Sequence, residues 1–95
     1  MTSNLPAIAL PAQVLQAQAQ SVADSLTLQL LSRVAQGHAA ELDASALSHF
    51  DSSALAVVLA CRRAVLAKGA PLRLHGLPAR AQALAQVYGV SELLA

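Results

Sequence analysis

The chain is organised around one stretch, Leu42-Asp43-Ala44-Ser45-Ala46-Leu47-Ser48-His49-Phe50-Asp51-Ser52-Ser53-Ala54-Leu55. Its first residues are expected to end a strand, and a short polar loop follows in which Leu47 and Phe50 point inward. Asp51, Ser52 and Ser53 then open a helix whose first two turns are apolar. The pattern gathers hydroxyls, a carboxylate and free backbone N–H groups at one exposed corner, as in a docking or modification site.

Length and composition limit the possible functions. A chain of 95 residues is long enough for one core, so we expect one domain over residues 1–95. Hydrophobic residues make up 56% and aromatic residues 2%, so the core must consist of Leu, Val and Ala. A formal net charge of +1, with only Phe50 and Tyr88 available for stacking, argues against nucleic-acid binding. A small chain with so many apolar residues and so few charges is expected to cover part of its surface with a protein partner.

The apolar composition does not predict a membrane span, because no uninterrupted apolar window reaches about 18 residues. The N-terminus has no basic side chain and is interrupted by Pro6 and Pro11, so no signal peptide is expected. The single cysteine, Cys61, is compatible with a reducing cytoplasm.

Hydrophobic periodicity predicts strands and helices in alternation. We expect strands over residues 5–10, 14–19, 39–42 and 72–75, the second because its residues alternate with a period of two. Helices are expected from residue 24 or 25 to Gly37, over residues 52–68 and from Pro78 to Gly89, followed by an apolar tail over residues 90–94. The order β-β-α-β-α-β-α predicts an α/β fold with helices packed on one face of a sheet.

The helix over residues 52–68 has two unlike faces on a helical wheel. The face expected in the core carries Leu55, Val58, Leu59, Val65 and Leu66. The opposite face carries alanines at positions 56, 60, 64 and 67, where a solvated helix normally has charges. Two interpretations stay open for Ala56 and Ala60. They form a small-residue contact with another protein, or they are helix formers in an alanine-rich chain.

Ser52 also has two interpretations. Asp51, Ser52 or Ser53 can cap the helix by accepting hydrogen bonds from N–H groups of its first turn. Alternatively, Ser52 is a phosphate acceptor, because the helix N-terminus stabilises negative charge. A phosphate there would be repelled by Asp51 and would disrupt contact with an apolar partner.

The pattern Leu42-Asp43-x-Ser45-x-Leu47-x-x-Phe50-Asp51-Ser52-Ser53-x-Leu55 closely resembles the signature of STAS domains, which occur in sulphate transporters and anti-sigma-factor antagonists. The resemblance covers nearly the whole chain and implies a single STAS domain, with a mixed β-sheet of about four strands and helices on one face. In this pattern Ser52 matches the serine or threonine that is phosphorylated in the antagonists, and Asp51 matches the acidic residue before it. Ala54 stands where the family usually has glycine, and its methyl group is expected to restrict the approach of a partner.

Two subfamilies compete within this resemblance. Residues 84–94 resemble the small STAS subunit of the Mla-type ABC transporter, MlaB-like proteins in which a Leu-Ala-x-x-Tyr-Gly-Val-like run is common. That resemblance implies a cytoplasmic accessory subunit that binds the transporter's ATPase subunit through the Ser52 corner and the following helix. It would be peripheral to the inner membrane and support phospholipid transport and outer-membrane lipid asymmetry. The alternative is an anti-sigma-factor antagonist that a serine kinase controls through Ser52.

Motifs for catalysis or metal binding are not found. The sequence contains no glycine-rich phosphate loop, no nucleophile elbow and no zinc-protease motif. The three histidines and Cys61 lack metal-ligand spacing, and the five carboxylates form no clear acid–base pair. We therefore expect neither an enzyme nor a bound cofactor. A deep cavity lined by His49, Asp51 and Ser52 would change that interpretation.

Overall fold

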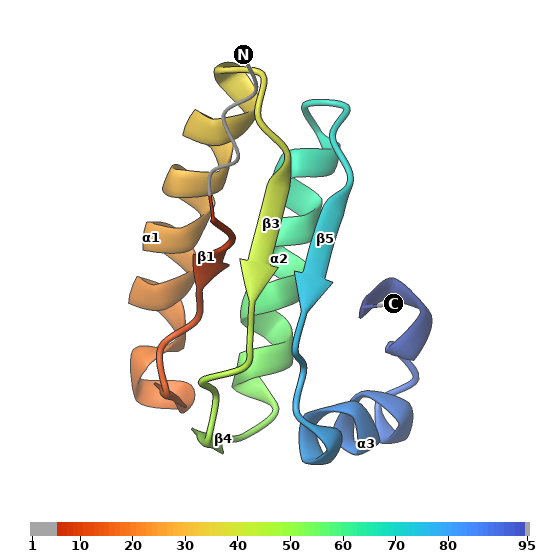
Figure 1. The fold of residues 1–95 in the computed structure, drawn as a ribbon. Helices are drawn as coiled ribbons and strands as arrows, with labels where there is room; N and C mark the ends of the chain where they lie inside the picture. The colour runs from red at the N-terminus through yellow and green to blue at the C-terminus, as the bar shows by residue number, and fades with distance from the viewer. Residues whose placement is uncertain (1–5, 95) are drawn as a thin grey trace.

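The computed structural model describes residues 6–94 of the chain. Its elements follow one another as short strands, three α-helices and a terminal 3₁₀ turn (Figure 1). They are β1 (Ile8–Ala9), β2 (Gln13–Val14), α1 (Gln16–Ala35), β3 (Ala40–Asp43), β4 (His49–Phe50), α2 (Ser53–Leu66), β5 (Leu72–His75), α3 (Ala79–Val87) and η1 (Ser91–Leu94).

The strands form two small sheets. One has the order β1-β3-β5, with Leu42 paired to Ile8 on one side and to Leu74 on the other. The second consists of β2 and β4. The predicted α/β class is confirmed. The strands differ from one mixed sheet of about four strands, because all the pairs formed within residues 6–94 are parallel and lie in two sheets.

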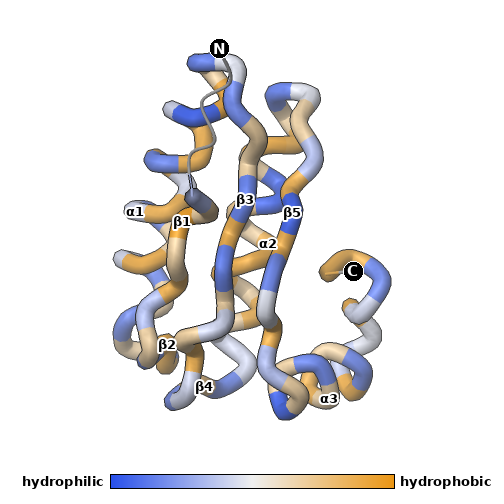
Figure 2. The backbone as a smooth tube through the Cα atoms, viewed as in Figure 1, coloured by the Kyte–Doolittle hydropathy of each residue, from blue (hydrophilic) through white to orange (hydrophobic). Residues whose placement is uncertain are grey.

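Two of the helices cover one face of the larger sheet. In Figure 1, α1 and α2 lie side by side behind the strands, and α3 lies beyond the lower end of β5. Leu42 is buried beneath these helices, while Glu41 and Arg73 alternate to the opposite, open face. The backbone of β3 and β5 accordingly alternates between hydrophilic and hydrophobic residues in Figure 2. Helix packing on a single face is therefore as predicted for α1 and α2.

The core lies between this helix pair and the sheet. Its largest fully buried side chains come from β2, β3, α1 and α2 and from Leu10 directly after β1, as a two-layer α/β arrangement requires. They are Leu10, Val14, Leu30, Leu42, Val57, Cys61 and Val65. Val57 and Cys61 belong to the flank of α2 that α1 covers, and the Cys61 Sγ lies 3.8 Å from the Thr27 hydroxyl oxygen.

One predicted strand is wrong. Within residues 14–19 only Val14 belongs to a strand, and α1 starts at Gln16, well before the predicted start at residue 24 or 25. The alternating residues there are Gln and Ala, which are among the better helix formers, so helix propensity prevails over the period-two pattern. The Gln18 side-chain oxygen accepts the Leu15 N–H at 3.0 Å, which satisfies a free donor at the helix start.

The predicted core face of α2 is also partly wrong. Leu66, expected in the core, is 43% exposed near the helix end, whereas Ala54 at the other end is buried. The predicted strand over residues 39–42 is shifted by one residue in β3, and β5 has the predicted bounds. Of the predicted strand over residues 5–10, Ile8 and Ala9 form β1, and Leu5 lies outside the described residues.

Candidate functional site

The corner at the start of α2 is held by Asp51. Its carboxylate oxygens accept two backbone hydrogen bonds, Oδ1 from the Ser53 N–H at 2.8 Å and Oδ2 from the Gln16 N–H at 3.3 Å. Ser53 begins α2 and Gln16 begins α1, so one side chain ties the two helix N-termini together. The backbone N–H of Ser53 is the largest reason why the pKa of Asp51 lies below its ordinary value, because hydrogen bonds to the carboxylate stabilise its charged form.

The Asp51 side chain accepts the first N–H of α2, and main-chain carbonyls of Asp51 and Ser52 accept the next ones, so no serine hydroxyl is needed as a cap. Ser52 stands immediately before α2 with helical dihedral angles, and its side chain makes no capping hydrogen bond. Both Ser52 and Ser53 are partly exposed. Of the three capping candidates in the sequence, the structure therefore selects Asp51, and the Ser52 hydroxyl stays accessible beside the helix N-terminus.

Ser52 opens onto a shallow groove of about 280 Å³. The groove lies between α2 and the segment that follows α3, and its walls are apolar apart from Ser52 itself. It is lined by Ser52, Leu55, Ala56, Leu59, Tyr88 and Val90. Val90 reaches α2 because Gly89 adopts a positive φ of 72° and reverses the chain after α3.

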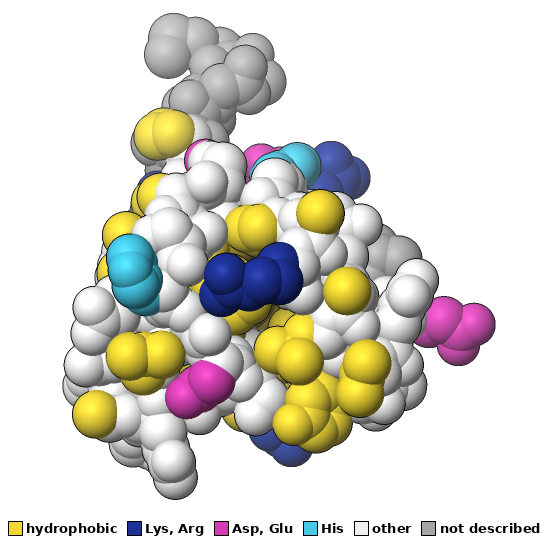
Figure 3. Space-filling view, turned by 90° about the horizontal axis from the view of Figure 1, so that it is seen from below, with side chains coloured by type: hydrophobic (Ala, Val, Ile, Leu, Met, Phe, Trp, Pro, Cys, Tyr) yellow, Lys and Arg dark blue, Asp and Glu magenta, His cyan; other side chains and the backbone are white. Residues whose placement is uncertain are grey.

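Large apolar side chains extend this groove over the surface. Tyr88 is 59% exposed, and its neighbour Val87 is 80% exposed. In Figure 3, which views the molecule from below, hydrophobic side chains gather on one side of the face. Since a large side chain normally loses this exposure in a folded protein, the groove has the character of a protein contact. We call the groove residues, together with the exposed Val87 that precedes Tyr88 in the chain, the α2 groove surface.

The predicted site residues are only partly brought together. Ser52 and Ala56 line the groove, and Ala56 is exposed. Ala60, one turn further on, is half-buried and lies outside the lining. Asp51 and Ser53 flank the groove at the start of α2 without lining it.

Ala54 does not face a partner as expected from the sequence. Its side chain is 2% exposed and belongs to the core. The methyl group that replaces the family's usual glycine therefore fills interior space, and the expected restriction on a partner's approach is wrong.

Sequence reasoning missed the contribution of Val87, Tyr88 and Val90 to this surface. The predicted helix from Pro78 to Gly89 includes Tyr88, whereas Tyr88 is the C-cap residue of α3 and largely exposed. The only available signal was Gly89, which predicts a chain reversal but not the element that the chain then contacts.

The rest of the titratable groups show no metal site. Within residues 6–94, no group of three or more His, Cys, Asp or Glu side chains is arranged to hold a metal ion. Cys61 is fully buried, and burial raises the pKa of its thiol. His49 and Asp51 do not line the groove that holds Ser52. None of the helices in the described part is long and apolar enough to cross a bilayer.

A parallel sheet backed by α1 and α2, with a serine corner at the start of α2, defines a STAS-like α/β domain. Comparison with protein families agrees with this class, since the family model described as "Mlab, STAS domain" matches residues 10–95. The match spans most of the sequence, so the chain belongs to the MlaB-like STAS domain family. No curated protein matches the chain.

Proposed function

We propose that this protein is a non-catalytic, cytoplasmic accessory subunit of a Mla-type phospholipid-transport ABC transporter. Acting as one domain over residues 1–95, it binds the ATPase subunit and supports assembly and activity of the complex. Its contribution to outer-membrane lipid asymmetry is then indirect, and its association with the inner membrane runs through the partner. Membership of the MlaB-like STAS family supports this proposal.

The observation that carries the proposal is the α2 groove surface. It is apolar, partly hollow and exposes Val87 and Tyr88. Ala56 lies in the groove, where a side chain without bulk lets another polypeptide approach the helix closely. Burial of such a surface yields roughly 25 cal/mol for each Å² of apolar area removed from water, which favours a protein partner.

Within this proposal each predicted residue has a defined part. Ser52 and Ala56 contact the ATPase directly, and Ala60 forms the outer boundary of the contact. Asp51 acts as a positioning residue, because it fixes the starts of α1 and α2 relative to each other. Ser53 supplies the N–H that Asp51 accepts.

The alternative function is that of an anti-sigma-factor antagonist switched by a serine kinase. The accessible Ser52 hydroxyl at a helix N-terminus favours it. Against it stands the family match over residues 10–95, whose description names the MlaB-like STAS domain. For this reason we place the antagonist second.

Co-purification with the ATPase subunit of a Mla-type transporter from the same genome tests the proposal. Ala56→Lys puts a charge into the groove and is expected to abolish co-purification while the protein stays folded. Ala67→Lys is the matched control, because Ala67 is exposed at the opposite end of α2 and makes the same charge change. An ATPase complex that survives Ala56→Lys would refute the proposed contact.

The antagonist is tested separately by mass spectrometry of the protein purified from its own cells. Stoichiometric phosphate on Ser52, together with binding to a serine kinase and none to the ATPase subunit, would reverse the order of the two candidates.

A further inference from the structure

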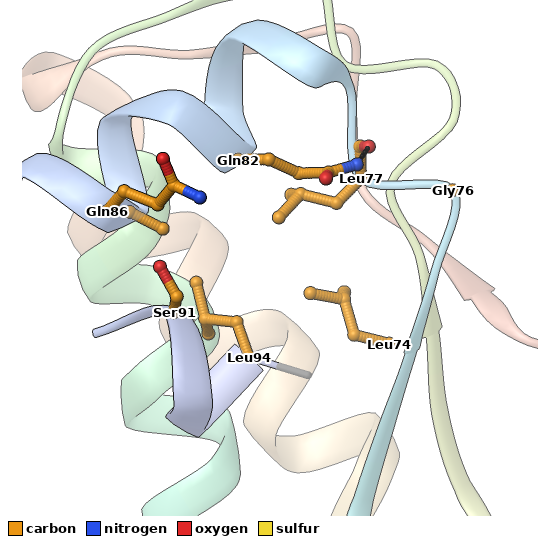
Figure 4. A pocket seen from close by; sticks show the side chains of 8 residues that line it. Leu74, Gly76, Leu77, Gln82, Gln86, Ser91 and Leu94 are labelled. Carbon is orange, nitrogen blue, oxygen red and sulfur yellow. Dashed lines mark hydrogen bonds between the residues drawn. The ribbon is translucent and has the colours of Figure 1, made fainter. Parts of the chain in front are cut away.

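A second groove lies away from Ser52, between β5, α3 and η1. Figure 4 shows Leu74 and Leu77 on one side of it, facing Ser91 and Leu94 across an open space, with Gln82 and Gln86 along α3. Its volume is about 350 Å³. The Gln82 side-chain amide donates to the Leu77 carbonyl at 2.8 Å and so fixes one wall.

The groove runs along a free edge of the sheet, because β5 is the last strand in the order β1-β3-β5. The His75 carbonyl accepts the Ala44 N–H at 2.8 Å on the β3 side. Along a strand, the N–H and C=O groups of successive residues point to opposite neighbouring strands. Those of Arg73 therefore point to β3, as those of His75 do, and those of Leu72 and Leu74 point outward from the edge of the sheet. Within residues 6–94 nothing hydrogen-bonds the backbone of Leu72 or Leu74 on that outer side.

Ser91 adds a polar group to the wall of this groove. Its hydroxyl oxygen is buried and has no hydrogen-bond partner among the described residues. A buried hydroxyl without a partner is unfavourable, so a peptide group that bonded it would be stabilised.

The charges beside this edge indicate what kind of segment fits. Arg73 and His75 project from β5 to the open face, and His75 Nε2 lies 3.3 Å from a Glu41 carboxylate oxygen. Arg73 lies opposite Glu41 in the register of β3 and β5, but within residues 6–94 it forms no ion pair, and the Glu41 carboxylate lies beside His75 instead. A strand added to β5 would lie about 4.8 Å from it and about twice as far from the acidic residues of β3, so Arg73 would be its nearest charge.

We propose that the β5 edge binds an extended peptide segment of another protein, in which acidic and apolar residues alternate, as an added strand of the sheet. The segment's main chain bonds the free peptide groups of Leu72 and Leu74. One of its apolar side chains enters the groove, and a carboxylate on its other face lies opposite Arg73. This site is separate from the α2 groove surface and goes beyond the proposed function.

A second copy of the chain fits this edge less well. Strands paired antiparallel must keep their faces aligned, so the registers that pair most of β5 put Arg73 opposite either Arg73 or His75 of the other copy. Arg73 opposite Arg73 brings like charges together, which is unfavourable, and neither register gives Arg73 a carboxylate partner from the other copy. An acidic segment meets no such repulsion.

The test uses the full-length protein labelled with ¹⁵N and a capped eight-residue peptide of alternating glutamate and valine. Binding is expected to slow hydrogen exchange of the Leu72 and Leu74 amides, which are free, and to leave the Arg73 and His75 amides nearly unchanged. The corresponding lysine–valine peptide should bind at least tenfold more weakly. Equal affinity for the two peptides, absence of binding, or protection outside β5 would overturn the proposal.

Two variants locate the contacts in the same assay. Arg73→Glu should weaken binding of the glutamate peptide roughly tenfold, and Arg63→Glu on α2 is its control with an equal change of charge. Gln86→Trp fills the groove from the exposed side of α3 and should abolish binding, whereas Ala83→Trp on the same helix lies outside the groove lining and should not. If Gln86→Trp binds as the unmodified protein does, the groove is not the site. If the Leu74 amide is protected from hydrogen exchange without peptide, and this protection rises with protein concentration, the edge binds a second copy of the chain and the proposal is wrong.

Discussion

Replacement of Gly76 by alanine tests how β5 is joined to the end of the sheet. Gly76 has a φ of +71°, and a Cβ atom there would lie 2.9 Å from the Ser45 Cβ and 3.2 Å from the Asp43 Oδ1. The left-handed conformation costs alanine about 1–2 kcal/mol, and relieving the contact by backbone movement costs about 1–3 kcal/mol. Alanine also restricts the unfolded chain, which offsets about 0.4–1 kcal/mol. We therefore expect Gly76→Ala to lower the free energy of unfolding by about 2–4 kcal/mol.

The control is Gly89→Ala, whose φ of +72° matches, but whose added Cβ would have no neighbour within 4 Å. It should lower the free energy of unfolding by only about 1 kcal/mol, because strain remains and the contact is absent. Urea unfolding followed by far-UV circular dichroism measures both variants, with the m-value as a check on two-state behaviour. In a domain of this size the difference corresponds to a Tm shift of about 4–8 °C per kcal/mol. Equal losses in the two variants would refute the predicted contact with Ser45.

Three further predictions concern the site and its surroundings. The pKa of Asp51 is lowered in the folded protein, so its contribution to stability is complete above the unfolded value of 3.8 and is lost as pH falls through the folded value. Asp51→Asn should therefore unfold more easily than the wild type at neutral pH, and urea titrations should show this difference narrowing as the pH falls below 3.8. Ala54→Gly should lower the free energy of unfolding by about 1–2 kcal/mol, from the lost methyl burial and lower helix propensity, without changing affinity for the ATPase subunit; a weaker complex in a pull-down would contradict the burial of Ala54. The Cys61 thiol, buried and with a raised pKa, should react with a disulfide reagent only at the rate of unfolding, and immediate labelling of the folded protein would show that the site is open.

Local signals predicted most of the elements correctly. Strand β5 has its predicted bounds, and α2 lies within the predicted residues 52–68, because capping residues, apolar periodicity and Gly69 agree there. The prediction failed over residues 14–19, where Gln and Ala alternate in a segment that forms a helix. Neither residue type has a strong preference for a strand, so the period of two was coincidental.

For the candidate site, the sequence predicted which residues lie at the start of α2 but not which hydrogen bonds each of them makes. It singled out Asp51, Ser52 and Ser53 as possible caps, which follows from their side-chain chemistry. The hydrogen bond from the Ser53 N–H to Asp51 is local, but the second one, from the Gln16 N–H, exists only because α1 packs beside α2. A partner so distant in the chain leaves no local pattern.

The amino-acid sequence alone determined that residues 42–55 carry a strand, a loop and a helix start, because strand alternation and helix capping depend on near neighbours. It also determined the STAS resemblance, since the signature lies in one continuous stretch. Only the tertiary structure decided that Tyr88 and Val90 join Ser52 and Ala56 in one groove, and that β5 is an edge strand of the described sheet beside a second groove. The physical reason is that both surfaces arise where distant segments pack together, and packing depends on the whole core.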